Sequence, residues 1–436
     1  MDVTHRAALR LDLRSWARNV DLPELIRRHE TPLLVLQPER AAARYRALRR
    51  ALPFIRFHYA VKALNHAAVL RAVHRAGGFF EVASRSELDS VQAAGSDLGT
   101  CLYTHPIKRV SDIDDAYRRG IRTFVVENAR EIDKFIGRPA DIQLLLRLSF
   151  PNPEAKVDLS AKFGAEPADA IGLVAYAIEN GVSVNGLSFH VGSQTNTTRP
   201  YRSAIIRCLR IIEQIRLGLD HKLEILDIGG GLPVAYRDGV CNADDIIDTI
   251  RTLLAPHAHR LTIIAEPGRY IAAPCMTLIT TVIGEGTRQA TPWYYLDDGV
   301  YGAYSNVAWE NVHPSIIALK EMSRHPMSRI EAPPPALDPC VLAGPTCDSI
   351  DVIATDYPLP RLTIGDHLIS PMMGAYTLVT ACGFNGIPPP TVAQTMVRRT
   401  VAADSRGAES PRRKPECTAS RSREDLLNHE GICIHL

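Results

Sequence analysis

Lys62 stands where a charged side chain is not expected. It follows the apolar stretch Ile55–Val61, and it is one of only eight lysines, because most of the 50 basic residues are arginine. An amine at the end of a buried strand is poorly placed as a solvated charge, but it can attack a carbonyl carbon as a nucleophile. The position therefore indicates Schiff-base chemistry.

The elements around Lys62 predict the scaffold that positions it. Between residues 55 and 266, short apolar segments alternate with segments of helical periodicity. Eight strands are expected, at Ile55–Val61, Phe79–Ala83, Thr100–Thr104, Thr123–Val126, Ile142–Arg147, Val184–Phe189, Glu224–Ile228 and Leu261–Ala265. This pattern predicts an α/β fold with a (β/α)8 TIM-type barrel, although a doubly wound open sheet has the same alternation.

Two turns containing glycine follow the seventh and eighth strands, where such barrels usually bind phosphate. They are Gly229-Gly230-Gly231 and Glu266-Pro267-Gly268-Arg269. Glycine lets backbone N–H groups approach an anion closely, and the Arg269 guanidinium adds a forked donor. A triple glycine alone would favour a plain structural turn. Because both turns are expected on the same rim as Lys62, together they predict a phosphate site.

Glu266 and His190 add groups that suit a flat aromatic cofactor. Glu266 ends the eighth strand and could accept a hydrogen bond from a protonated ring nitrogen, which turns a pyridine ring into an electron sink. A salt bridge to Arg269 is its structural alternative. His190 follows the sixth strand and could stack on the ring, or could be a buried structural histidine. With Lys62 and the phosphate site, these residues predict pyridoxal phosphate as the cofactor and no metal.

The pattern changes after Glu266 to strands without long helices between them. The expected strands are Met276–Ile283, Trp293–Asp297, Cys340–Ala343, Arg361–Ile364 and Met396–Thr400. They predict a second, mainly β domain of sandwich or barrel-like form. We expect residues 1–30 to join that domain, 31–270 to form the barrel, 271–400 to form the β domain, and 401–436, with little apolar content, to be disordered.

Seven motifs, in this order, closely resemble those of the pyridoxal-phosphate decarboxylases with an alanine-racemase-type barrel, and among them the eukaryotic-type ornithine decarboxylases. They are Tyr59-Ala60-Val61-Lys62, His190-Val191-Gly192-Ser193-Gln194, Asp227-Ile228-Gly229-Gly230-Gly231, Glu266-Pro267-Gly268-Arg269, Gly344-Pro345-Thr346-Cys347-Asp348, Gly374-Ala375-Tyr376 and Phe384-Asn385-Gly386. The resemblance covers about residues 55 to 390.

The resemblance implies a role for each matching residue. Lys62 would hold the cofactor, His190 would stack on its ring, and Glu266 would face the ring nitrogen. The phosphate would be held by Ser193, Gly230, Gly231, Gly268, Arg269 and Tyr376. Near Lys62 and the ring, the matching positions are Glu81, Glu87 and Arg147, and the family usually has aspartate where this chain has Glu81.

The resemblance also implies a homodimer with the active site at the subunit interface. Cys347 and Asp348 would enter from the partner subunit, with Cys347 supplying a proton and Asp348 binding substrate. Tyr376 would also contact the substrate.

Substrate choice depends on Glu310. Family ornithine enzymes have Tyr-Asp where this chain has Trp309-Glu310, and that acid holds the distal ammonium. A buried cation still needs an anionic partner, so we predict decarboxylation of an L-diamino acid such as ornithine to the diamine and carbon dioxide, as in polyamine supply. We hypothesise that the longer acid favours a shorter, diaminobutyrate-like substrate.

Other functions compete with this prediction. Within the decarboxylases they are diaminopimelate decarboxylation or a specialised siderophore or antibiotic pathway. Racemases on the same barrel pair the ring nitrogen with arginine, against which Glu266 argues. A catalytically dead regulatory homologue would lose cofactor residues, whereas Lys62, Glu266 and Cys347 are all present.

Composition limits partners and compartment. The net charge of +2 gives no indication of nucleic acid binding. Nine cysteines without CxxC pairs favour a reducing, cytoplasmic location. No apolar run approaches the roughly 18 residues of a membrane span.

Overall fold

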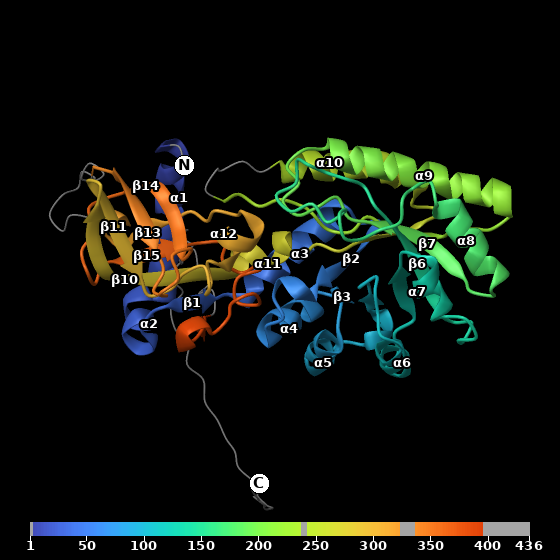
Figure 1. Cartoon of the computed structure of the whole chain (residues 1–436), viewed down its shortest axis with the longest axis horizontal. Helices are drawn as coiled ribbons and strands as arrows, with labels where there is room; N and C mark the ends of the chain where they lie inside the picture. Colours follow the sequence, from blue (N-terminus) through green and yellow to red (C-terminus); the bar gives the residue numbers. More distant parts are fainter. Residues whose placement is uncertain (1–2, 237–241, 323–335, 396–436) are drawn as a thin grey trace, which may run out of the picture. The chain divides into compact units, whose positions relative to one another are not determined.

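A closed barrel of eight parallel strands forms the first part of the fold (Figure 1). The computed structural model describes residues 3–236, 242–322 and 336–395. The barrel strands are β2 (Ile55–Ala60), β3 (Phe79–Val82), β4 (Leu102–Tyr103), β5 (Thr123–Val126), β6 (Gln143–Leu148), β7 (Val184–Phe189), β8 (Ile225–Asp227) and β9 (Thr262–Ala265). The α/β barrel and all eight predicted strands are therefore confirmed, with ends that shift by one or two residues.

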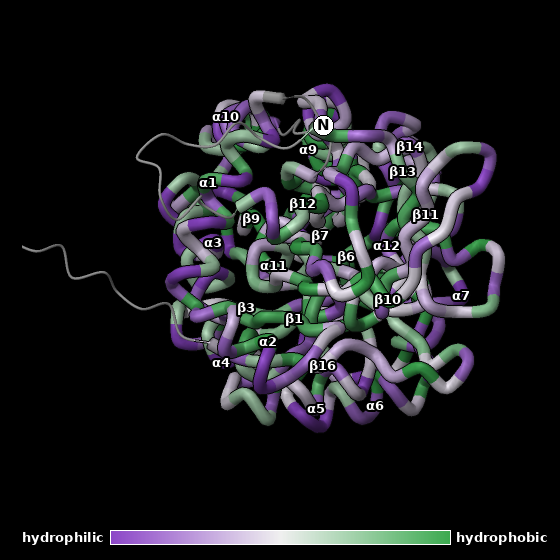
Figure 2. Tube along the Cα trace, turned by 90° about the vertical axis from the view of Figure 1, so that its left-hand side faces the viewer, coloured by the Kyte–Doolittle hydropathy of each residue, from purple (hydrophilic) through white to green (hydrophobic). Residues whose placement is uncertain are grey.

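Helices connect these strands, as expected of a parallel barrel. They are α4 (Ala67–Arg75), α5 (Arg85–Ala93), α6 (Val110–Arg118), α7 (Ala129–Asp133), α8 (Ala170–Glu179), α9 (Arg199–Leu219) and α10 (Ala243–Leu254), and α3 (Pro38–Ala51) precedes β2. Both faces of the strands are covered, so residues such as Phe124 and Leu146 are fully buried. Figure 2 shows hydrophobic residues gathered on the strands and hydrophilic ones on the outer helices and loops.

Local capping fixes where several helices start after the strands. Ser84 Oγ accepts a hydrogen bond from the Glu87 N–H, and Glu87 Oε2 accepts one from the Ala83 N–H, at 3.3 and 2.6 Å. This reciprocal arrangement is a form of capping box. Asn128 caps α7 through the N–H of Glu131 at 3.0 Å. These caps fix the starts of α5 and α7 shortly after β3 and β5. Among the described helices, none is long and apolar enough to cross a membrane.

A mixed sheet of eight strands makes up the second part. Its strands are β1 (Leu33–Leu36), β10 (Met276–Arg288), β11 (Thr291–Leu296), β12 (Ile317–Ala318), β13 (Asp338–Ala343), β14 (Val352–Leu359), β15 (His367–Ser370) and β16 (Thr391–Gln394). Two short helices, α11 (Arg269–Ala272) and α12 (Ser305–Glu310), lie along the chain between β9 and β12. The mainly β character predicted after Glu266 is confirmed.

The strand predicted at Arg361–Ile364 is wrong. The segment is a turn after β14, because Gly365 has φ of 94° and the Asp366 carboxylate accepts a hydrogen bond from the Thr363 N–H at 2.7 Å. The strand predicted at Met396–Thr400 lies outside the described residues.

The N-terminal helices α1 (Val3–Val20) and α2 (Leu22–His29) pack on the mixed sheet. Trp16 belongs to one buried cluster with Ile317 and Ile369. Leu33 of β1 lies opposite Ile279 of β10 and Thr391 of β16, although residue 33 falls within the range proposed for the barrel. The four proposed domain ranges stay a proposal, and residues 401–436 lie outside the described residues.

Candidate active site

Lys62 lies in a single 3-10 turn, η1 (Val61–Ala63), directly after β2. Its Nζ is 2.6 Å from Glu81 Oε2 at the end of β3, and its side chain is 40% exposed while that of Glu81 is fully buried. The Tyr376 N–H donates to the carbonyl of Ala63 at 3.0 Å, so a loop of the second sheet is tied to this turn. The amine is thus reachable from solvent but held by a buried acid.

Thr104 donates its hydroxyl proton to the other oxygen of Glu81. This threonine follows β4 and was not predicted as a site residue, although a polar side chain at a barrel strand end was a usable signal. The family's usual aspartate is one methylene shorter than Glu81. The longer side chain here reaches Lys62 and Thr104 at the same time.

The charges around Lys62 keep its amine protonated. Burial lowers the pKa of Lys62, but Glu81, then Glu266 and Tyr376, outweigh it and raise that pKa above its ordinary value. An ammonium must release a proton before its nitrogen can attack a carbonyl, and the contact with Glu81 opposes that release. Burial and the charge of Glu81 raise the pKa of Glu87 to about 7, so a second acid nearby can take up a proton near neutrality.

Glu266 and Asp227 form a buried pair of acids at the ends of β9 and β8. Burial, then the charge of Asp227, raises the pKa of Glu266 well above its ordinary value, and burial also raises that of Asp227. Asp227 Oδ1 accepts a hydrogen bond from the Gly229 N–H at 2.9 Å, and among the described residues its buried Oδ2 has no donor other than a proton shared with Glu266. Such a pair favours a protonated group beside it. Asp227 stood in a recognised motif, yet no role was predicted for it.

His190 and Arg147 lie on the same rim, after β7 and within β6. His190 Nδ1 accepts a hydrogen bond from the Gly192 N–H at 3.0 Å. Burial, then Arg147 and Lys62, lower the pKa of His190 well below its ordinary value. A neutral, flat imidazole suits stacking on a ring. The Arg147 guanidinium lies 5.2 Å from the ring centre of Phe163.

The two glycine turns form a cradle too tight for any side chain. A Cβ on Gly230 would lie 2.7 Å from the Glu266 carbonyl oxygen, and one on Gly231, which has φ of 115°, would lie 2.5 Å from the Gly192 oxygen. A Cβ on Gly268 would lie 3.3 Å from the Tyr376 hydroxyl oxygen. Backbone N–H groups in such a cradle can approach an anion that larger residues would keep out.

Arg269 supplies the positive charge beside this cradle. Its Nε and Nη2 both donate to Ser193 Oγ at 3.1 Å, and its Nη1 donates to the Tyr236 hydroxyl at 3.1 Å. The guanidinium carbon lies 4.8 Å from the ring centre of Tyr376. Ser193, Arg269 and Tyr376, predicted to share one ligand, therefore meet in the structure. Tyr236 is an additional contact that no sequence motif indicated.

Glu310 also meets Arg269. Its Oε2 accepts a hydrogen bond from Arg269 Nη2 at 2.5 Å, with 17% of the glutamate side chain and 4% of the arginine side chain exposed. The predicted substrate acid thus lies against the predicted phosphate arginine. The role of Glu310 toward a substrate stays a prediction.

Cys347 and Asp348 lie in a separate exposed loop. The Cys347 N–H donates to Asn385 Oδ1 at 3.0 Å, and the Tyr301 hydroxyl donates to Asp348 Oδ2 at 2.5 Å. Tyr301 stacks on Phe384 with ring centres 4.5 Å apart. Within the described ranges, no hydrogen bond or ion pair joins this loop to Lys62. The described hydrogen bonds and ion pairs therefore do not link Cys347 and Asp348 to the rim residues.

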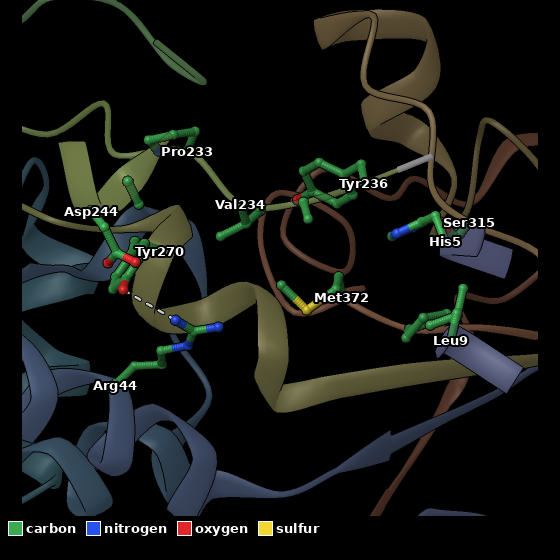
Figure 3. A pocket seen from close by; sticks show the side chains of 13 residues that line it. His5, Leu9, Arg44, Pro233, Val234, Tyr236, Asp244, Tyr270, Ser315 and Met372 are labelled. Carbon is green, nitrogen blue, oxygen red and sulfur yellow. Dashed lines mark hydrogen bonds between the residues drawn. The ribbon is translucent and has the colours of Figure 1, made fainter. Parts of the chain in front are cut away.

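A cavity of about 290 Å³ adjoins the cradle through Tyr236 (Figure 3). The cavity is also lined by Val234, Met372 and Arg44. Arg44 donates a hydrogen bond of 3.1 Å to the Tyr270 hydroxyl. Lys62 and Glu266 are not part of its lining. The cavity is thus a neighbour of the rim site and does not hold the reactive groups.

The chain is similar to known decarboxylases along most of its length. A family model described as pyridoxal-dependent decarboxylase, pyridoxal binding domain, matches residues 39–273. The lysine/ornithine decarboxylase of Selenomonas ruminantium is 32% identical over 84% of this chain and 90% of its own length. Antizyme inhibitor 2 of Xenopus laevis is 32% identical over 80% of this chain and 77% of its own length.

Solved structures agree with these sequence matches. The lysine/ornithine decarboxylase of Vibrio vulnificus complexed with putrescine has a TM-score of 0.78 and 37% identity, covering 87% of this chain and 98% of that chain. The arginine decarboxylase of Paramecium bursaria Chlorella virus bound to agmatine has a TM-score of 0.77 and 31% identity. The match covers 86% of this chain and 99% of that chain.

Proposed function

Because this chain belongs to the pyridoxal-dependent decarboxylases that act on basic amino acids, we propose that it converts an L-diamino acid such as ornithine to the corresponding diamine and carbon dioxide. The observation that carries the proposal is the meeting of Lys62, the buried acid Glu266 and the Arg269 cradle on one barrel rim.

The rim residues fit pyridoxal phosphate. Gly230, Gly231 and Gly268 pack their backbone against neighbouring protein atoms where no Cβ fits without a shift, and Arg269 with Ser193 adds charge and a hydroxyl for a phosphate group. When bound, the cofactor supplies an aldehyde that condenses with amines and a ring that accepts electrons as carbon dioxide leaves.

Each of the rim side chains has a separate role toward the bound cofactor in this proposal. Lys62 would provide the amine that binds and releases the cofactor's aldehyde carbon, and Glu81 would orient that amine through its hydrogen bond. Glu266, supported by Asp227, would hold a proton at the ring nitrogen of the bound cofactor. His190 would stack on the ring and exclude water from that side.

A head-to-tail homodimer completes the site in this proposal. Cys347 is exposed, and Asp348 lies in the same loop, tied to Tyr301, so both are available to a neighbouring copy. Cys347 would return a proton to the substrate carbon after carbon dioxide leaves. The cytoplasmic location and a place in polyamine supply belong to the same proposal.

The substrate's distal cation selects it from other amino acids. Lysine, ornithine and arginine, named in the relatives, all end in a cationic group, and Glu310, Asp348 and Tyr376 are the residues that would receive it. A longer acid at Glu310 brings its carboxylate further into the site, which favours a shorter substrate.

A panel of amino acids tests the proposal. Purified protein with pyridoxal phosphate is given ornithine, lysine, arginine, 2,4-diaminobutyrate and meso-diaminopimelate, and released carbon dioxide is measured. We expect release from a diamino acid and at most slow release from diaminopimelate. Absence of carbon dioxide from every substrate overturns the proposal and favours a non-catalytic role, whereas preference for lysine over all shorter acids overturns the chain-length argument alone.

A further inference from the structure

Arg269 has its hydrogen-bonding capacity largely occupied within the chain. Of its five N–H groups, four are directed at Ser193, Tyr236 and Glu310. The ring of Tyr376 covers a face of the guanidinium at 4.8 Å. Arg269 is 4% exposed, so an incoming anion cannot bind it from open solvent without displacing a partner.

Glu310 is the partner that an anion would displace. Ser193 and Tyr236 are neutral hydroxyl groups and can remain as neighbours of a bound phosphate. Glu310 is a carboxylate at 2.5 Å, and it carries the same sign of charge as the phosphate. Like charges that share a largely buried site repel strongly, because water screens them poorly there.

The position of Glu310 makes such a displacement feasible. It is the last residue of α12, a helix of only six residues, and Asn311 follows it with φ of 51°. Its side chain is 17% exposed, so the carboxylate is at the edge of the site. A rotation of this side chain moves the charge without unfolding any strand.

We propose that Glu310 is a built-in counter-anion of Arg269, which the cofactor's phosphate displaces, so that phosphate binding frees Glu310 for the distal ammonium of the substrate. This inference rests on the proposed function and deepens it, because it sets an order in which cofactor precedes substrate. It also makes Glu310 a competitor of phosphate, the opposite of a residue that merely orients Arg269.

Two cofactor forms separate these roles. Cofactor-free wild-type protein and Glu310→Gln are titrated with pyridoxal phosphate and with pyridoxal, which lacks the phosphate, and dissociation constants are read from absorbance and fluorescence. For each protein, the dissociation constant of pyridoxal phosphate is divided by that of pyridoxal. Comparing this ratio between the two proteins removes the difference in affinity that the two cofactor forms have in any case. We expect Glu310→Gln to bind pyridoxal phosphate about tenfold more tightly than wild type, as for one like charge removed from such a site, with pyridoxal unchanged.

Glu213→Gln is a matched control. Its pair with Arg216 has the same 2.5 Å separation but lies on the exposed surface of α9, so neither dissociation constant should change. Glu310→Ala provides a second variant should the glutamine form fold poorly, as judged by circular dichroism. Equal or weaker binding of pyridoxal phosphate by the Glu310 variants overturns the inference. Carbon dioxide release by the wild type is measured separately, so that result leaves the proposed function intact.

Discussion

Replacing Asp227 with asparagine should stabilise the cofactor-free chain. Asp227 is buried, and its Oδ2 finds a donor only in a proton shared with the neighbouring Glu266 carboxyl. Asparagine keeps an oxygen for the Gly229 N–H and puts an amide donor where Oδ2 was. Once the shared proton is lost, the unpartnered buried acceptor costs about 1–3 kcal/mol, so the free energy of unfolding should rise by up to that amount at the upper end of the pH range.

The gain should grow with pH. Burial, then the neighbouring acid, raises the pKa of Glu266, and burial raises that of Asp227. The folded chain therefore holds a proton that the unfolded chain releases above about pH 4. The bound proton stabilises the folded chain at low pH. Raising the pH toward the raised pKa removes this contribution to the free energy of unfolding, by at most about 1.4 kcal/mol per pH unit for each proton. Asp227→Asn removes one acid of the pair, so its stability should fall less steeply.

Denaturant unfolding of the cofactor-free proteins between about pH 5 and pH 8 measures both effects. Glu213→Gln serves as control, because Arg216 lowers the pKa of this exposed acid and no buried proton is involved. The reasoning would be refuted if Asp227→Asn were less stable than wild type near about pH 8. It would also be refuted if the free energy of unfolding of the variant fell with pH as steeply as that of wild type.

The same substitution should weaken catalysis. Asp227 adds negative charge near the place of the ring nitrogen, which favours the protonated nitrogen that draws electrons from the substrate. Asp227→Asn should therefore lower the rate of carbon dioxide release at saturating cofactor. Higher stability with lower turnover is the expected mark of an acid kept for function.

Three further outcomes are expected. Lys62→Ala should lose the visible absorbance of lysine-bound cofactor together with turnover, and retention of both would remove Lys62 from its role. Thr104→Val should lower the free energy of unfolding by about 1.5–3 kcal/mol, because the Glu81 carboxylate loses a donor, and an unchanged denaturation midpoint would argue against that bond. Equal amounts of Lys62→Ala and Cys347→Ala, each inactive alone, should regain about one quarter of wild-type activity when mixed, since about half the dimers then hold one intact site; no recovery would contradict a shared site.

The barrel was predictable because its signal is local. Each strand is a short apolar run ended by a polar or glycine turn, as at Phe79–Val82, and the capping serine Ser84 follows at once. The second sheet gave weaker signals. Strand β14 (Val352–Leu359) contains Asp356 and Pro358, which are unfavourable in strands, and its pairing with β13 overrides these local preferences.

The candidate site was predictable as far as strand ends determine it. Lys62, His190 and Glu266 sit where the strand count places them. The contacts of Thr104 with Glu81 and of Glu310 with Arg269 join side chains from elements far apart in sequence, so their partners follow only from packing.

Strand β1 (Leu33–Leu36) has a consequence for how the chain folds during synthesis. Its two neighbours are β10, which follows the last barrel strand, and β16, near the end of the described residues. The barrel segment from β2 to β9 lies between them in sequence, so all of it emerges from the ribosome before β1 can find either partner. Until then the apolar β1 presents open edges, and such edges invite pairing with other chains. The first strand to be made is thus among the last to be secured.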